Sequence, residues 1–199
     1  MAITSCVTSI AKSIAPNCAS PIVGGWTGRA VLIPSGDPTV AITQDGSNPR
    51  IVTAIAAAGV DPMNIVGVEN FYTVPFENSN KASNGDNGQI EFTKTVSFHI
   101  PLRGAANSKD IVEPLAKSAL GFIVVAEKKV KVGDGSYEVI GLLSGLKVNA
   151  DGIAQDEAVS SGDVVVTMSC VESWFECTFF DTDYPTTKAA FDTLYAAVI

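Results

Sequence analysis

The stretch IEFTKTVSFHI, residues 90–100, alternates between two kinds of side chain along its whole length. In an extended strand, successive side chains point to opposite faces, so every second residue shares a face. One face carries Glu91, Thr93, Thr95, Ser97 and His99, and the other carries Ile90, Phe92, Lys94, Val96, Phe98 and Ile100. The second face is apolar apart from Lys94. The stretch predicts a long β-strand that lays one face on a hydrophobic core.

Further short runs of β-branched and aromatic residues surround this strand and indicate a mainly β fold. Ala30–Pro34 and Thr39–Thr43 predict a hairpin around Ser35–Pro38, whereas Ile51–Ala58 fits a strand or a helix. The segment 132–148 predicts a meander with turns at residues 132–136 and at Ser144-Gly145. The remaining predicted strands are Ile65–Glu77, Phe122–Lys131, Tyr137–Leu143, Leu146–Asn149, Asp163–Val171 and Trp174–Phe180.

Two helices are predicted to pack on the sheets. Asn107–Leu120 carries Asp110 three residues before Glu113, a variant of a capping box, and Gly121 follows it as a C-terminal stop. The second helix begins after Asp183, with Pro185 in its first turn. Its apolar stripe consists of Phe191, Leu194, Tyr195 and Val198.

The run NSNKASNGDNGQ, residues 78–89, contains no side chain suited to a core. Asn, Ser, Gly and Asp favour turns, so the run predicts a flexible, exposed hairpin loop between two long strands. Either the loop has no role, or it reaches a neighbouring subunit and becomes ordered on assembly.

Composition limits the functions that the chain can serve. With 199 residues, one domain is expected, and 17% charged residues is low enough to suggest that copies or partners cover part of the surface. The formal net charge of -8 repels the phosphates of DNA and of anionic membranes. No targeting sequence or membrane-spanning stretch is recognised, which indicates a cytoplasmic start.

No catalytic or metal-binding motif stands out, so neither an enzyme nor a cofactor is expected. His99 is the single histidine, and its place in an alternating strand favours a strand-face residue over a catalytic base. The cysteines match no zinc spacing. They are either buried free thiols or include a Cys6–Cys18 disulfide; the other two are Cys170 and Cys177.

Between Lys147 and Lys188 the chain has no Lys or Arg but many carboxylates. A solvated acidic face explains this pattern simply. If that face pointed into a channel, it would repel DNA and let the polyanion slide without sticking. The residues expected at such a lumen are Asp151, Asp156, Glu157, Asp163, Glu172 and Glu176.

The order of long strands with a polar hairpin, a helix, the meander GSYEVIGLLSGLKV and the late strand DVVVTMSC resembles the tail tube proteins of tailed bacteriophages. The stretch APNCASPIVGGWTGRAVLIP, residues 15–34, is similar to the start of virion proteins from phages of Bacteroidota hosts. This resemblance implies a β-sandwich or barrel-like domain over residues 1–199 with one or two flanking helices.

The resemblance also implies a structural virion protein whose copies, commonly six, close into a ring. Stacked rings would form the tail tube, a conduit for DNA, which passes as transient, non-specific cargo. Assembly would take place in the host cytoplasm, with residues 1–28 as an arm against a neighbour. The loop 78–89 would contact the next ring through Asn80, Lys81, Asn84, Gly85, Asp86 and Asn87.

Two other classes stay open. A head decoration or adaptor protein would share the composition but form trimers or single rings instead of tubes. A carbohydrate-binding β-sandwich would expose aromatic side chains, for which Trp26, Tyr72, Tyr137 and Trp174 are the candidates. Core or interface burial is the simpler use of these four residues.

Overall fold

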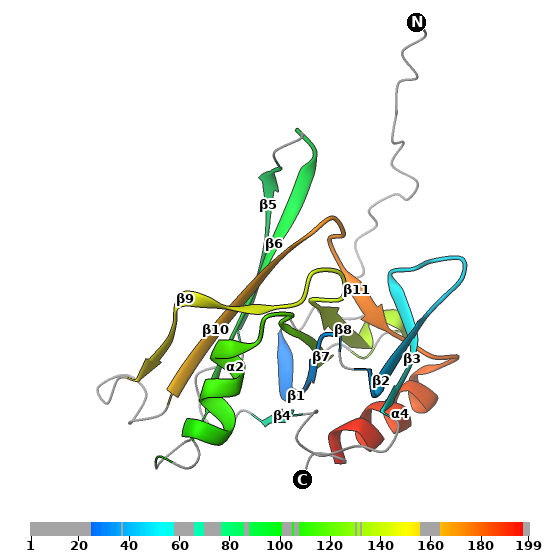
Figure 1. Cartoon of the computed structure of the whole chain (residues 1–199). Helices are drawn as coiled ribbons and strands as arrows, with labels where there is room; N and C mark the ends of the chain where they lie inside the picture. Colours follow the sequence, from blue (N-terminus) through cyan, green and yellow to red (C-terminus); the bar gives the residue numbers. More distant parts are fainter. Residues whose placement is uncertain are drawn as a thin grey trace, which may run out of the picture.

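The computed structural model describes residues 25–36, 38–57, 66–69, 77–85, 88–100, 105, 108–129, 131, 133–155 and 164–196. These residues form two β-sheets and two short α-helices (Figure 1), which confirms the predicted mainly β fold. The larger sheet has the strand order β2-β3-β11-β8-β7-β1-β4, and the smaller one has the order β5-β6-β10-β9.

The strand bounds are as follows. The larger sheet contains β1 (Trp26–Pro34), β2 (Val40–Gln44), β3 (Ile51–Ala57), β4 (Val66–Glu69), β7 (Phe122–Lys128), β8 (Tyr137–Ile140) and β11 (Cys177–Phe179). The smaller sheet contains β5 (Glu77–Asn84), β6 (Ile90–Ile100), β9 (Lys147–Gln155) and β10 (Val164–Glu172).

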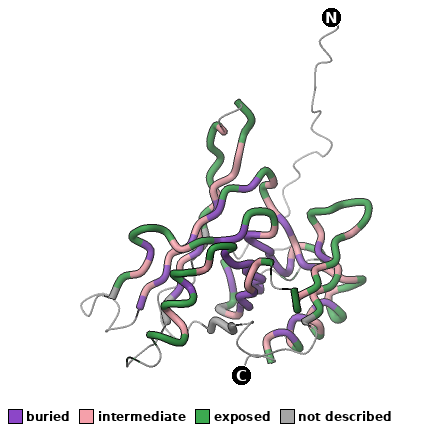
Figure 2. The backbone as a smooth tube through the Cα atoms, in the orientation of Figure 1, coloured by how far each residue is buried: buried purple, intermediate pink, exposed green. Residues whose placement is uncertain are grey.

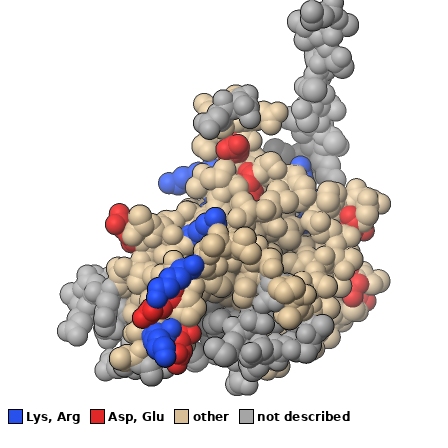
Figure 3. Space-filling view, in the orientation of Figure 1, with Lys and Arg blue, Asp and Glu red and all other residues tan. Residues whose placement is uncertain are grey.

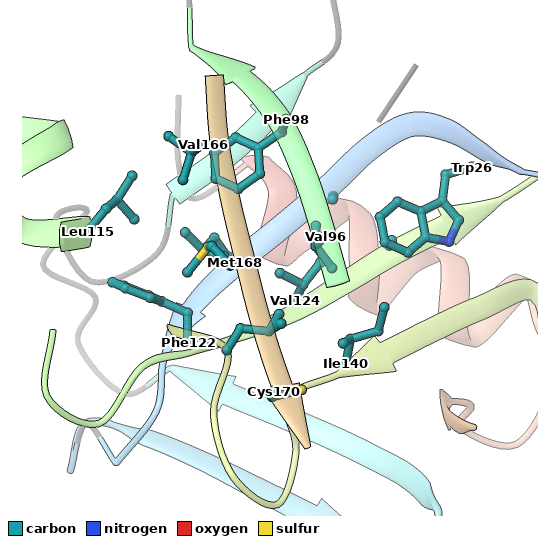
Figure 4. Packing of buried hydrophobic residues seen from close by; sticks show 14 of the residues in the cluster. Trp26, Val96, Phe98, Leu115, Phe122, Val124, Ile140, Val166, Met168 and Cys170 are labelled. Atoms are coloured by element: carbon teal, nitrogen blue, oxygen red, sulfur yellow. The ribbon is translucent and has the colours of Figure 1, made fainter. Parts of the chain in front are cut away.

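The larger sheet is buried on both faces in its centre, where six residues of β7 in succession are buried. On one face Phe122, Val124 and Ala126 pack against the smaller sheet, whose Val96, Phe98, Val166 and Met168 complete this core (Figure 4). On the other face Ile123 and Val125 pack with Phe191 and Leu194 of the C-terminal helix. Figure 2 shows the buried residues concentrated where these layers meet. The first five residues of β7, Phe122–Ala126, form the continuous apolar run that a strand covered on both faces requires.

Strand β6 has the bounds and the facing that its alternation predicts. It pairs with β10 in an antiparallel register from Val164↔Ile100 to Glu172↔Phe92. Val96 and Phe98 are buried on the predicted face, and so is Lys94. The side chain of His99 lies outside the described residues.

The C-terminal helix α4 (Tyr184–Ala196) begins where predicted, since Asp183 Oδ1 accepts a hydrogen bond of 2.8 Å from the Thr186 backbone N–H. The other predicted helix consists of a π-helical turn η1 (Ser108–Val112) and the helix α2 (Glu113–Lys117). Asp110 therefore lies inside the helical segment and does not cap it. The helix stops before Ser118, whose extended backbone ends it earlier than predicted.

The expected hairpin of β1 and β2 is wrong. Strand β1 pairs with β4 and β7, whereas β2 pairs with β3, so the ambiguous segment at residue 51 is a strand. The turn residues after Pro34 direct the chain away from β1, and the Ser35 N–H donates to Gly121 O at 2.9 Å. Turn chemistry predicted that the chain bends but not which strand it pairs with next.

The predicted meander is correct for its first two strands only. Strands β7 and β8 pair antiparallel around a 3-10 turn, η2 (Gly133–Ser136), but β9 joins the other sheet and pairs with β10. The chain changes sheets at residues 141–146, where Gly141 has φ +84° and Gly145 has φ +69°. A Cβ at Gly145 would lie 2.2 Å from Leu120 O, so the crossing requires glycine for space as well as conformation.

Four other strand predictions need shorter bounds, among them Tyr137–Leu143, whose strand β8 ends at Ile140. Of Ile65–Glu77, only β4 and the first residue of β5 are described as strand, and residues 70–76 lie outside the described part. Strand β7 ends at Lys128, and β11 contains only Cys177–Phe179. Cys170 and Cys177 are buried free thiols, whereas Cys6 and Cys18 lie outside the described residues.

Candidate assembly surface

The hairpin of β5 and β6 projects beyond the two-sheet body (Figure 1). Its strands pair antiparallel from Glu77↔Ser97 to Asn84↔Ile90. At the tip, the Gly85 N–H donates to Gln89 O at 2.7 Å, and Gly88 takes φ +71°. Strand β10 pairs with β6 as far as Phe92, so only the last two residue pairs of the hairpin, Ser83↔Glu91 and Asn84↔Ile90, form a two-stranded end. A two-stranded end is only marginally stable by itself in water.

The flexible loop predicted over residues 78–89 is therefore wrong for most of its length. Asn80, Lys81 and Asn84 belong to β5, and only Gly85 of the predicted contact residues lies at the described tip. Asp86 and Asn87 lie outside the described residues. An edge strand is held by its backbone hydrogen bonds, so a polar run can be a strand although it supplies nothing to a core.

Asn80 fastens the base of the hairpin to the turn between β10 and β11. Its Nδ2 donates to Phe175 O at 2.5 Å, while its Oδ1 is buried and lacks a hydrogen-bond partner among the described residues. The Phe175 ring packs edge-on against Phe92 with the ring centroids 5.4 Å apart, yet 54% of Phe175 is exposed. The hairpin is thus anchored at its base and unsupported at its tip.

The face of the smaller sheet that points away from the larger one carries hydroxyl side chains. Thr93, Thr95 and Ser97 of β6 lie beside Thr167 and Ser169 of β10. Ser97 and Thr167 share a hydrogen bond of 3.0 Å, and Ser169 Oγ donates to Asn149 Oδ1 at 2.5 Å. These five hydroxyl side chains are half-buried and carry no charge. Their polarity is typical of a protein surface and not of a hydrophobic core.

The described sheets have open edges. Strands β5 and β9 bound the smaller sheet, and β2 and β4 bound the larger one. Unpaired edges attract strands of other chains unless something covers them. Large apolar side chains also remain at the surface, namely Ile90, Leu120, Leu143, Val171 and Phe175.

The acidic tract does not form one continuous face. Glu172 is buried and paired with Lys94, so its expected place at a lumen is wrong. Glu176 pairs with Lys128, whereas Asp151 on β9 is exposed. Strand pairing brings cations from distant sequence to these carboxylates, which the local sequence could not indicate. Asp156, Glu157 and Asp163 lie outside the described residues.

Charges of both signs are scattered over the face of the molecule that Figure 3 shows, and most of its described surface is uncharged. Among the described residues, no three His, Cys, Asp or Glu side chains gather where a metal ion could be held. None of the described helices combines the length and the apolarity needed to cross a bilayer.

The aromatic residues considered for carbohydrate binding do not form an exposed platform. Trp26 and Tyr137 are buried, and Trp26 Nε1 donates to Glu138 Oε2 at 3.0 Å. Trp174 is half-buried against the core around α4, with the Arg50 guanidinium 6.0 Å from its ring centroid. Tyr72 lies outside the described residues.

No family model, curated protein or solved structure matches this chain.

Proposed function

We propose that this chain is a structural virion protein that assembles into stacked rings and forms the tail tube of a bacteriophage. The observation that carries the proposal is the β5–β6 hairpin, a polar ribbon that extends beyond the body of its own chain. Its last two residue pairs, Ser83↔Glu91 and Asn84↔Ile90, extend past β10 as a two-stranded end, which gains stability when another molecule covers it. Contact with a copy in the next ring would supply that cover.

Open sheet edges support lateral assembly. In the proposed ring, β5 of one copy and β9 of the next are the candidates for joining, because both bound the same sheet. Such pairing would satisfy the backbone groups that an isolated edge leaves to water, and repeating it around an axis would close a ring. The number six for the ring comes from the family resemblance alone.

The negative net charge supports a conduit that does not hold its cargo. A chain of net charge -8 repels a polyanion at long range, so DNA would pass through the tube without sequence-specific contacts. Among the described residues that were predicted to line the lumen, Asp151 is the one that is exposed. The proposed location is the tail of the virion, assembled in the host cytoplasm.

A head decoration or adaptor protein remains the second candidate, because it would use the same exposed apolar residues and open edges. Stacking separates the two functions: a tube protein must bind copies along the axis as well as around it. The carbohydrate-binding alternative is weaker, since two of its candidate aromatic residues are buried.

Shortening the hairpin tests the proposal. Deletion of Ser83, Asn84, Ile90 and Glu91 removes two residue pairs and keeps every remaining side chain on its own face. The hairpin loses about 7 Å of reach while its tip is retained. We expect a folded protein that forms rings but no tubes in electron micrographs. The control Ser83→Thr/Glu91→Gln keeps the length and should form tubes; tubes of normal length from the deletion variant would contradict the stacking role.

A further inference from the structure

A pocket of about 300 Å³ opens where β1 ends and β7 begins. Its apolar lining comes from several elements: Pro34, Val40, Ile42, Ile123, Leu142 and Leu143. Ser35 and Gln44 are the polar side chains among the lining residues, and none of the lining residues is charged. Such a pocket suits an uncharged, apolar occupant.

Exposed apolar side chains extend this pocket onto the surface. Leu143 at its lip is 48% exposed and the neighbouring Leu120 is 61% exposed. The Leu120 side chain lies against Gly36, one of the residues that line the pocket. A Cβ added at Gly36 would lie only 2.8 Å from Leu120 Cδ1. The pocket also borders β2, which pairs with β3 alone among the described strands. An extended segment could therefore pair with this edge and place alternate side chains in the pocket.

Residues 1–24 of the chain have the composition of such a segment. They contain one charged side chain, Lys12, and several β-branched apolar residues: Ile3, Val7, Ile10, Ile14, Ile22 and Val23. The segment joins the fold at Gly25, next to the last residues of β7, because the Lys129 N–H donates to Gly25 O at 3.0 Å. The hairpin tip, rich in Asn, Gly and Asp, is a poorer match for an apolar pocket.

The segment and the pocket lie at opposite ends of the same strand. The segment joins β1 at Trp26 and the pocket lies beyond Pro34, so about 26 Å of extended strand separates them. To fill the pocket of its own chain, the segment would have to reverse and run back along the whole of β1. A second copy placed head to tail needs no reversal, because its pocket end then faces the first copy's segment.

We infer that the pocket lined by Val40, Ile42, Ile123 and Leu142 binds the N-terminal segment, residues 1–24, of a second copy of this chain. The inference rests on the proposed stacking, which supplies the head-to-tail placement. A contact between two different surfaces of the same protein repeats without closing, so each ring would hold the next through these segments. The hairpin and the segment would then be two separate links between rings.

Photo-cross-linking of the full chain tests this contact. The cross-linking amino acid p-benzoylphenylalanine replaces Leu143, and protein labelled with ¹⁵N is mixed with unlabelled protein before assembly and irradiation. We expect mass spectrometry to find peptides from residues 1–24 joined to position 143, with one partner labelled and the other not. The same amino acid in place of Val171, which is also 48% exposed but does not line the pocket, is the matched control.

A second variant measures the strength of the contact. Leu143→Asp places a charge at the lip of the pocket and should raise the protein concentration needed for tubes at least about tenfold, whereas Val171→Asp should raise it less. Cross-links that join position 143 only to its own copy, or to other segments, would overturn the inference. Tubes that form without the cross-link would overturn the inference about the pocket and leave the tube proposal standing. Full-length protein that never assembles would contradict both the inference and the tube proposal.

Discussion

Lys94 Nζ lies 2.6 Å from Glu172 Oε2 between β6 and β10, and both side chains are almost fully buried. Charge attraction holds the pair, since neither atom has a hydrogen-bond partner of good geometry among the described residues. The other oxygen, Glu172 Oε1, accepts a hydrogen bond of 3.0 Å from the Leu143 backbone N–H. One buried carboxylate therefore neutralises the single cation of an apolar strand face and holds the loop that forms the lip of the pocket.

Removal of one partner of this pair should be costly. In Lys94→Met the carboxylate of Glu172 stays buried without its cation, and we expect a loss of about 3–5 kcal/mol in the free energy of unfolding. The double variant Lys94→Met/Glu172→Gln has no charge at this site and keeps an acceptor for the Leu143 N–H, so it should recover most of that loss. Urea unfolding followed by circular dichroism measures both values.

The exposed pair of Lys117 and Glu113 is the control, because their side chains are 73% and 51% exposed. Lys117→Met should cost less than about 1 kcal/mol. Similar losses at Lys94 and Lys117, or a double variant no more stable than Lys94→Met, would contradict the buried pair.

Glu138 makes stability depend on pH. Burial raises the pKa of this carboxyl above its ordinary value of 4.5, and the charge of Glu176 adds to the effect. Lys128, the hydrogen bond from Trp26 and the charge of Lys94 oppose it. The folded protein binds the proton more tightly than the unfolded chain, so the contribution of Glu138 is greatest below 4.5 and is lost as pH rises through the folded pKa.

Glu138→Gln removes this titration and keeps an oxygen for Trp26 Nε1. Relative to the unchanged protein, the variant should gain stability as the pH rises from about 4 to about 7. Urea unfolding at a series of pH values, at concentrations below assembly, gives the two profiles. Parallel profiles over this range would show that Glu138 is not desolvated as described.

The sheet crossing at Gly145 should not tolerate a side chain. Its φ is +69°, and a Cβ would lie 2.2 Å from Leu120 O, so Gly145→Ala adds a collision to an unfavourable conformation. Gly133 is a matched control, with φ +50° and nothing within 4 Å of its added Cβ. We expect Gly133→Ala to cost about 1–2 kcal/mol and Gly145→Ala about 1–3 kcal/mol more. Equal shifts in the urea midpoint would mean that the crossing is looser than described.

The two described cysteines should be unreactive in the folded protein. Burial raises the pKa of the Cys170 thiol to about 12 and that of Cys177 to about 11, so very little thiolate exists near neutral pH. A maleimide should modify both residues only after unfolding in urea, as read by peptide mass spectrometry. Rapid labelling of either residue without urea would contradict their burial.

The features that sequence predicted well depend on local patterns. Strand β6 follows from its alternation, and helix α4 follows from the Asp183 cap and the apolar stripe of Phe191 and Leu194. These signals are local because a strand or helix with one buried face must repeat its apolar residues at its own period. The mainly β class followed from several such strands.

The features that sequence missed depend on distant pairing. Strand β1 pairs with β7 as well as with β4, and in the pairing with β7 its Ala30 lies opposite Ala126, 96 residues later in the chain (126 minus 30). No local pattern encodes that choice. Glu172 was expected on an acidic face because its cation, Lys94, lies 78 residues away in the sequence (172 minus 94). Lys94 itself is the local indication, because a single cation on an otherwise apolar strand face requires a buried carboxylate beside it.

The central claim, assembly of this chain into stacked rings, is tested most directly by negative-stain electron microscopy of the purified full chain over a series of concentrations. The account predicts hollow rings that stack into tubes as the concentration rises. Compact monomers at every concentration would contradict it, and glycan binding would then be the next activity to measure.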